Sequence, residues 1–154
     1  MSAPFTFSAS YDKTTKVVSG VACLVLLVAA LASRNRFVAS VSAVVAVLAY
    51  AFSPRSYAVV GRTIIVNRLI GNVRIPLENL REARVSTPDD VTGCIRLWGS
   101  GGMFGYFGLF RTTKLGKCTW YVTRRDRMIV VATDLKTTLY SPDDTAGFLA
   151  AIRR

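Results

Sequence analysis

Two uncharged runs near the N-terminus constrain this chain more than any other feature. They are Val17–Ala32 and Phe37–Phe52, and only Ser33–Arg36 separates them. A surface helix of a soluble protein needs a polar side, and neither run has one. Each run has 16 residues, which is near the short end of what spans a hydrocarbon core of about 30 Å. The runs therefore predict two transmembrane helices.

The short connection fixes how the two helices run. Two helices joined by a four-residue link such as Ser33–Arg36 form an antiparallel hairpin. Small residues, which allow close approach of two backbones, recur in the second run at Ala39, Ser42, Ala43 and Ala46. The expected segments are an N-terminal tail over 1–15 and a hairpin over 16–54, with helices at about 16–33 and 37–53.

A cleaved signal peptide is the alternative interpretation of the first run. Ala30-Leu31-Ala32 resembles a signal-peptidase site, and Lys13 and Lys16 precede the run as a charged flank would. A product cleaved there would begin almost at once with the second apolar run. The hairpin is therefore the favoured interpretation.

Positive charge is unevenly distributed around the hairpin. The formal net charge is +11, and cytoplasmic loops of membrane proteins carry an excess of Lys and Arg. The flanks hold Lys13, Lys16, Arg55, Arg62 and Arg68, whereas the turn holds Arg34 and Arg36. This difference predicts a multi-pass protein with both termini and the C-terminal domain in the cytoplasm. A basic domain held at a membrane favours anionic headgroups over nucleic acid, so we expect a bilayer and no nucleic acid.

Residues suited to catalysis are missing or scattered. The chain has no histidine, which excludes His-based acid–base chemistry, Ser-His-Asp triads and most zinc sites. Cys118 follows Gly116-Lys117 where a Walker loop needs Ser or Thr. The carboxylate pairs Asp89-Asp90 and Asp143-Asp144 fit turn or cap positions. We expect no enzyme, no cofactor, no metal site and no small-molecule substrate.

The cysteines leave two alternatives open. Cys23 lies inside the first apolar run, whereas Cys94 and Cys118 are single residues near or within predicted strands. A Cys94–Cys118 disulfide is one alternative. The favoured one is a pair of buried thiols that pack as small hydrophobic groups.

Residues 57–154 have the pattern of a mostly β domain. Short runs rich in Val, Ile, Thr and aromatic residues alternate with turn residues. The predicted strands cover 57–60, 63–67, 73–77, 81–86, 94–98, 119–123, 128–133 and 137–141. A helix is predicted at about 142–152, with Ser141 as its N-cap, Pro142 at the first position and Phe148 in its apolar stripe. We expect a curled antiparallel sheet whose open end this helix plugs.

Three segments of this domain resemble the bacterial pleckstrin-homology-like (PH-like) family of membrane proteins. They are 64–80, 96–110 and 140–144 together with Phe148. The two-helix hairpin in front of them matches that context. The resemblance implies a PH-like split β-barrel that is mainly β with a C-terminal α-helix, preceded by a transmembrane hairpin in a bacterial inner membrane. It also implies an adaptor or scaffolding role, although the family has no uniform activity.

The stretch Trp98–Phe110, with the sequence WGSGGMFGYFGLF, combines glycines with large apolar side chains. One interpretation is a tight turn whose aromatic side chains fold back onto the barrel or the hairpin. The other is a loop that contacts the bilayer interface or a partner. The candidate contact residues are Trp98, Met103, Phe104, Tyr106, Phe107 and Phe110.

A group of basic residues follows this stretch. Its members, which are candidates for contact with anionic lipid, are Arg111, Lys114, Lys117, Arg124, Arg125 and Arg127. On adjacent strands they would form one cationic face, or else a solvated edge whose charges oppose strand aggregation. We expect a membrane-anchored module that binds or scaffolds protein partners, either a membrane protein or a second copy of itself. The alternative is a lipid-binding or lipid-sensing module that uses the basic face.

Overall fold

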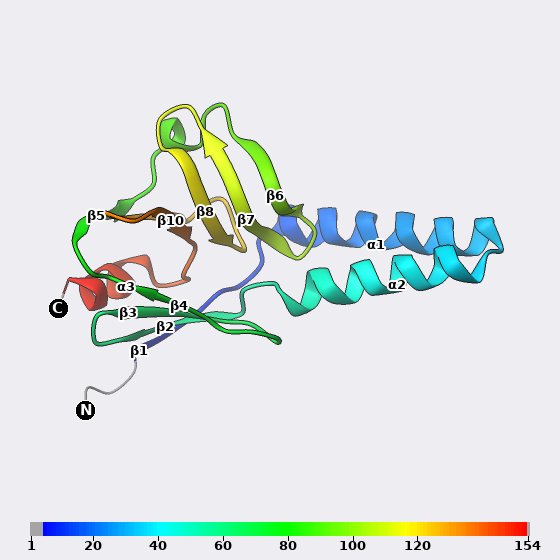
Figure 1. The fold of residues 1–154 in the computed structure, drawn as a ribbon, viewed down its shortest axis with the longest axis horizontal. Coiled ribbons are helices and arrows are strands. Elements are labelled where there is room, and N and C mark those ends of the chain that lie inside the picture. Colours follow the sequence, from blue (N-terminus) through cyan, green and yellow to red (C-terminus); the bar gives the residue numbers. More distant parts are fainter. Residues whose placement is uncertain (1–4, 154) are drawn as a thin grey trace.

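Two β-sheets and a projecting helical hairpin form the structure, a computed structural model that describes residues 5–153 (Figure 1). The first sheet has four antiparallel strands in the order β1-β2-β3-β4. Their bounds are β1 Phe5–Ser8, β2 Ser56–Val60, β3 Thr63–Asn67 and β4 Val73–Pro76. The helices α1 (Lys13–Ser33) and α2 (Arg36–Ala51) lie between β1 and β2 in the chain. The hairpin is therefore an insertion between two paired strands.

Strand β1 falls within residues 1–15, where we expected only a tail. Phe7 pairs with Tyr57 of β2, and its ring meets the Phe148 ring edge-on with centroids 5.3 Å apart. A four-residue alternation is too short to stand out in a sequence, and this strand gains its stability from a partner on the other side of the hairpin. Both ends of the hairpin are consequently held at the same sheet.

The second sheet has six strands in the order β5-β9-β10-β8-β7-β6. Their bounds are β5 Leu80–Val85, β6 Ile95–Gly102, β7 Gly105–Thr112, β8 Gly116–Val122, β9 Ile129–Thr133 and β10 Thr137–Tyr140. The expectation of a wholly antiparallel sheet is wrong at one place, because β10 is parallel to β8. The chain skips one strand position between β8 and β9, and β10 then fills the gap. Because β8 and β9 run in opposite directions, a strand between them must be parallel to one of them.

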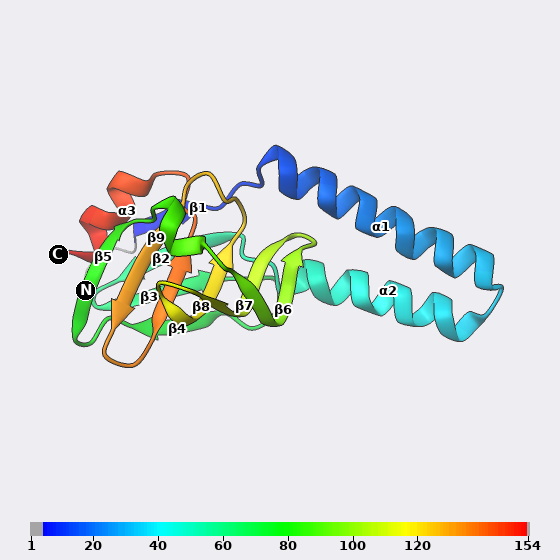
Figure 2. The ribbon, with the colours of Figure 1, turned by 90° about the horizontal axis from the view of Figure 1, so that it is seen from above.

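The main core lies between the two sheets, and α3 (Thr145–Ile152) closes it at the end of the domain remote from the hairpin (Figures 1 and 2). The Phe148 ring of α3 lies 5.8 Å from the Tyr57 ring and 5.7 Å from the Tyr140 ring, measured between centroids. The predicted architecture is confirmed: a mainly β domain with a C-terminal helix, preceded by two apolar helices.

The start of α3 differs from the prediction of 142 with Ser141 as N-cap. The helix begins at Thr145, and the Asp144 carboxylate caps it by accepting a hydrogen bond from the Gly147 amide at 2.9 Å. The Ser141 hydroxyl is buried and accepts instead from the Thr123 amide at 2.8 Å. Serine is a suitable N-cap residue, but the hydroxyl of Ser141 is hydrogen-bonded to the backbone just after β8 and does not cap the helix.

The helices α1 and α2 project side by side away from both sheets (Figure 1). The Asp12 carboxylate caps α1 through the Thr15 amide at 2.6 Å, and the Asn35 side chain caps α2 through the Phe37 amide at 2.9 Å. Among residues 5–153, α1 alone is long and apolar enough to cross a bilayer by length and composition, because the apolar α2 has only 16 residues. Their bounds differ from the predicted 16–33 and 37–53 by at most three residues.

Candidate binding surface at the base of the hairpin

The glycine-aromatic stretch is not a loop but part of a regular β-hairpin formed by β6 and β7. Its turn, Met103-Phe104, packs where α1 and α2 leave the domain. The Phe104 amide donates to the Ser19 hydroxyl at 2.7 Å, the Phe104 carbonyl accepts from the Ser53 hydroxyl, and the Phe104 and Tyr50 rings meet edge-on at 5.2 Å. This turn therefore contacts the helical hairpin itself.

Two glycines allow β6 and β7 to approach this closely. Gly99 and Gly108 pair across the two strands with φ values of 105° and 124°. A Cβ atom on Gly99 would lie 2.1 Å from the Phe107 carbonyl oxygen, and one on Gly108 would lie 2.3 Å from the Trp98 carbonyl oxygen. Glycine at both positions is thus a requirement of strand pairing, which explains part of the pattern that resembled a flexible loop.

The six candidate contact residues fall in very different places. Trp98 is 79% exposed, whereas Phe110 is 3% exposed and stacks on the Trp120 ring with centroids 4.5 Å apart. Phe110 is therefore a core residue and is not available for contact with a membrane or partner. The partly buried members are Met103, Phe104, Tyr106 and Phe107.

Strand β6 forms an open edge of the six-stranded sheet, because β7 is the only strand within residues 5–153 that pairs with it. The side chains of Ile95, Leu97 and Trp98 on this strand are 62%, 48% and 79% exposed. Pairing with β7 steps from Arg96 to Trp98, so Leu97 occupies an irregularity in the ladder. Ile95 and Leu97 were not among the contact residues predicted from the sequence, although their alternation with Arg96 is typical of a strand with one apolar side.

The expected single cationic face is not formed. Arg111 pairs with Lys117 at one end of the β7–β8 hairpin, whereas Arg124 follows the other end of β8. Strand β8 continues for five residues beyond Lys117, to Val122, which corresponds to roughly 17 Å, and Arg124 lies two residues further along the chain. The six basic residues therefore form two groups, because β8 runs the length of the sheet between them.

Acidic or aromatic partners engage several of these cations. Arg124 forms ion pairs with Asp126 at 2.7 Å and Asp143 at 3.3 Å, and the Arg125 guanidinium lies 5.4 Å from the Tyr106 ring centroid. The Arg125 amide also donates to the Asp12 carboxylate at 3.2 Å, which places this residue beside the start of α1. Arg125, one of the predicted lipid-contact residues, is thus hydrogen-bonded to the residue that caps the first helix of the hairpin.

Asp90 lies in the 3-10 helix η1 (Pro88–Val91), which connects β5 to β6. Its fully buried carboxylate accepts hydrogen bonds from the Arg84 guanidinium at 2.5 and 2.9 Å and lies 3.3 Å from the Lys114 ammonium. The Arg84 guanidinium, with the Thr87 amide and hydroxyl, holds the pKa of the Asp90 carboxyl well below its usual range. This network engages Lys114, one of the six basic candidates, and fits the expected cap role of Asp90.

Cys94 and Cys118 are free thiols on one side of the six-stranded sheet, in the cluster that also contains Phe110 and Trp120. Burial raises the pKa of both thiols. The structure thus has the buried-thiol alternative and not the disulfide. No group of three His, Cys, Asp or Glu side chains able to hold a metal ion occurs within residues 5–153.

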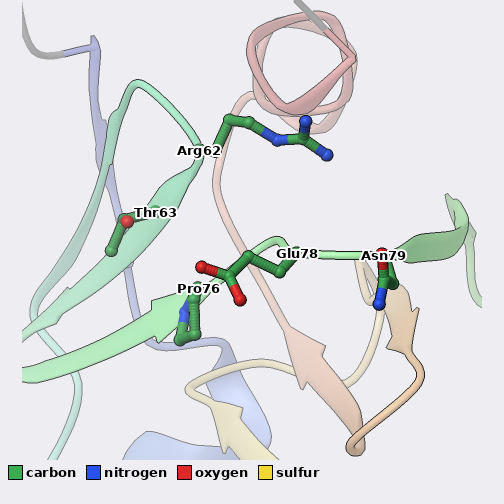
Figure 3. Close-up of a pocket in the computed structure, with 5 residues that line it drawn as sticks. All are labelled: Arg62, Thr63, Pro76, Glu78 and Asn79. Atoms are coloured by element: carbon green, nitrogen blue, oxygen red, sulfur yellow. The ribbon is translucent and has the colours of Figure 1, made fainter.

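One open depression lies at the end of the domain remote from the hairpin, with a volume of about 340 Å³. Its lining residues come from β3, β4 and the adjoining turns: Arg62, Thr63, Pro76, Glu78 and Asn79 (Figure 3). The Arg62 side chain extends toward α3 and the Glu78 carboxylate points toward Pro76, so their charged groups do not converge on one point (Figure 3). The depression offers no nucleophile held by a base.

Comparison with known proteins identifies the C-terminal two thirds of the chain. Residues 55–154 match the family described as "Bacterial PH domain". No curated protein and no solved structure gives a match.

Proposed function

The chain belongs to the bacterial PH domain family, and from this premise we propose that it is a membrane-anchored module that binds protein partners at the cytoplasmic face of the membrane. PH domains in general bind proteins or lipids and are typically not enzymes, and no catalytic family is indicated. The hairpin supplies the anchor in this proposal, and strand β6 supplies the binding edge.

The outward surface of the hairpin supports the anchoring role. Large apolar side chains on both helices are exposed, for example Leu31 at 69% and Phe37 at 74%. Such a surface is unfavourable in water and favourable in hydrocarbon. Because β1 and β2 pair on either side of the insertion, the N-terminal strand and the domain must lie on the same side of any membrane that the hairpin crosses.

The partner-binding proposal rests on the open, apolar edge of strand β6. An open strand edge presents backbone groups to which another strand can add, and soluble proteins usually protect such edges with charge or short length. This edge is eight residues long and carries the exposed side chains of Ile95, Leu97 and Trp98. The partner we propose is a membrane protein, or a second copy of this chain, that adds a strand beside β6.

Site-specific photo-crosslinking in intact cells tests this edge. A photoreactive phenylalanine analogue replaces Trp98 in the full chain, and the matched control carries it at Leu135, which is 81% exposed in the β9–β10 turn. We expect a protein adduct from position 98 and none from position 135. An adduct of twice the chain's mass would identify a second copy.

Two outcomes would contradict the proposal. If positions 95, 97 and 98 all give no adduct beyond the level at position 135, β6 is not a docking edge. If alkaline carbonate releases the full chain from cell membranes, the anchoring is wrong.

Anionic lipid binding is the second candidate, and the position of Arg125 beside the start of α1 favours it. Lys13, Lys16 and Arg55 are exposed near the same end of the hairpin. Full chain in nanodiscs of mixed neutral and anionic phospholipid tests the idea, with Arg125→Glu compared with Lys117→Glu at the far end of β8. A lipid-binding role predicts that Arg125→Glu alone lowers the anionic lipid retained after purification, whereas equal retention in both variants contradicts it.

A further inference from the structure

The turn between β3 and β4 carries two exposed aliphatic side chains. Leu69 is 58% exposed and Ile70 is 54% exposed, although turns of this kind usually present polar residues. The amides of both residues donate to the carbonyl oxygen of Ala51, at 3.1 and 3.3 Å. Because Ala51 ends α2, this turn is fixed at the point where α2 joins the domain.

The direction of the turn matches that of the hairpin. In Figure 1 the β3–β4 turn extends beneath the end of α2 that joins the domain, toward the same side as the projecting helices. Phe52, the residue after α2, is 37% exposed and lies beside Arg68 at the end of β3. These residues form a rim, which we define as Phe52, Arg68, Leu69 and Ile70.

The projecting part of the hairpin is short for a bilayer. Thr15 and Ser19 of α1 are buried against the domain, and the Thr15 hydroxyl donates to the Thr123 carbonyl at 2.9 Å. Only residues 20–33 of α1 extend freely, about 21 Å of helix, and α2 supplies about 24 Å. A hydrocarbon core is about 30 Å thick, so each helix falls several ångström short.

The charged tip prevents the hairpin from making up this difference at its far end. Arg34 and Arg36 flank the turn between the helices, and an arginine inside hydrocarbon is costly. The tip therefore belongs at the distant headgroups. The missing length then has to come from the domain end, where the rim lies.

Arg68 gives the rim a cation suited to the headgroup layer. Its guanidinium lies 5.7 Å from the ring centroids of both Phe52 and Tyr121, and it forms no ion pair with any carboxylate of residues 5–153. Its Nε atom is buried and has no hydrogen-bond partner in that part of the chain. An unpaired guanidinium beside exposed aliphatic groups is the combination that snorkelling side chains use at a bilayer surface.

We propose that the rim inserts into the bilayer, with Leu69 and Ile70 among the upper acyl chains of the leaflet on the domain's side and Arg68 at the lipid phosphates. The domain would then be partly embedded at the membrane surface. This inference rests on the proposed anchoring and adds a contact that the helices alone do not supply.

Depth-dependent fluorescence quenching tests the insertion in the full chain reconstituted into phosphatidylcholine vesicles. An environment-sensitive probe is attached after Ile70→Cys, in a chain that also carries Cys23→Ser and Cys94→Ser, while the buried Cys118 is retained. Val44→Cys, midway along α2, reports on the hairpin, and Leu135→Cys is the exposed control. The quenchers are doxyl-labelled phosphatidylcholines with the doxyl group near the headgroup or deep in the acyl chain.

We expect the shallow quencher to act most strongly at position 70, the deep quencher to act most strongly at position 44, and neither to act at position 135. Quenching at 44 without quenching at 70 or at Leu69→Cys overturns the proposed insertion and leaves the anchoring in place. Absence of quenching at 44 overturns the anchoring itself. Circular dichroism of each labelled chain establishes that the fold is retained.

Discussion

The Ser19 hydroxyl accepts a hydrogen bond from the Phe104 amide at 2.7 Å, across 85 positions of sequence. The same hydroxyl is within hydrogen-bonding distance, as a donor, of the Thr15 carbonyl oxygen at 2.6 Å and of the Gly102 carbonyl oxygen at 3.3 Å. One buried side chain on α1 thus joins the helical hairpin to the β6–β7 turn. This contact couples the direction of the helices to the position of the sheet.

Ser19→Ala should loosen that junction. The substitution removes the acceptor of the Phe104 amide, and an unsatisfied amide in a partly buried site costs about 1–2 kcal/mol. We expect a lower free energy of unfolding in detergent micelles and faster hydrogen exchange of the Phe104 amide. Ser40→Ala, at an exposed position of α2, is the matched control and should change neither. Unaltered exchange at Phe104 in Ser19→Ala would contradict the assignment.

Asp90→Asn should destabilise the domain by about 3 kcal/mol, because it removes the charge that the Arg84 and Lys114 side chains surround. Since the folded-state pKa of Asp90 lies below its usual value of 3.8, the carboxylate contributes stability above that value, and this contribution is lost as the pH falls toward the folded-state pKa. Thermal unfolding from pH 6 to pH 2 should therefore show a smaller acid dependence in the variant. Asp89→Asn, exposed in the same turn, should behave as the wild type.

Tyr57→Phe should alter stability at alkaline pH. The buried Tyr57 hydroxyl donates to the Tyr121 carbonyl at 2.6 Å, and burial raises the pKa of Tyr57 to about 12 from 10.0. The unfolded chain therefore loses this proton first, and the stability that the neutral hydroxyl provides disappears as the pH rises from about 10 to about 12. We expect the variant to lose about 1 kcal/mol at pH 7 and to have a smaller dependence in that alkaline range. Equal alkaline unfolding curves would exclude this role.

Gly108→Ala should disrupt the β6–β7 pairing. The added Cβ atom would meet the Trp98 carbonyl oxygen at 2.3 Å at a backbone φ of 124°, so the strands would have to separate. Faster hydrogen exchange along β6 and β7, and loss of the photo-crosslink from position 98, are the expected results. Gly20→Ala on α1, where an added Cβ meets nothing within 4 Å, should leave both readouts unchanged.

Local patterns predicted much of this fold. The hairpin, most of the short strands and the closing helix followed from runs of apolar residues, turn signals and capping residues that lie close together in sequence. Strand β1 and the parallel pairing of β10 with β8 did not, because each depends on a partner distant in the chain. The full length of β6 was also not predicted, because the glycines at 99, 101 and 102 are typical of a loop. Pairing with β7 is what explains the glycine at 99, where a side chain would collide with the Phe107 carbonyl oxygen.

The candidate contact residues were predictable only by type. Trp98 and Phe110 are both aromatic residues of one short stretch, yet Trp98 faces solvent and Phe110 stacks on Trp120. The irregular pairing at Leu97 and the two separated groups of basic residues likewise emerged from the arrangement of the strands. The residue types that could make contacts were predictable from the sequence, but the residues they pack against were not.

By itself the sequence determined that two apolar helices precede a small β domain, because hydrophobic periodicity and charge are properties of neighbouring residues. The tertiary structure alone decided that both ends of the hairpin join one sheet and that Leu69 and Ile70 lie beside the end of α2. It also decided which aromatic side chains are buried in the core. These features depend on which distant segments pair, and pairing is set by the packing free energy of the whole domain.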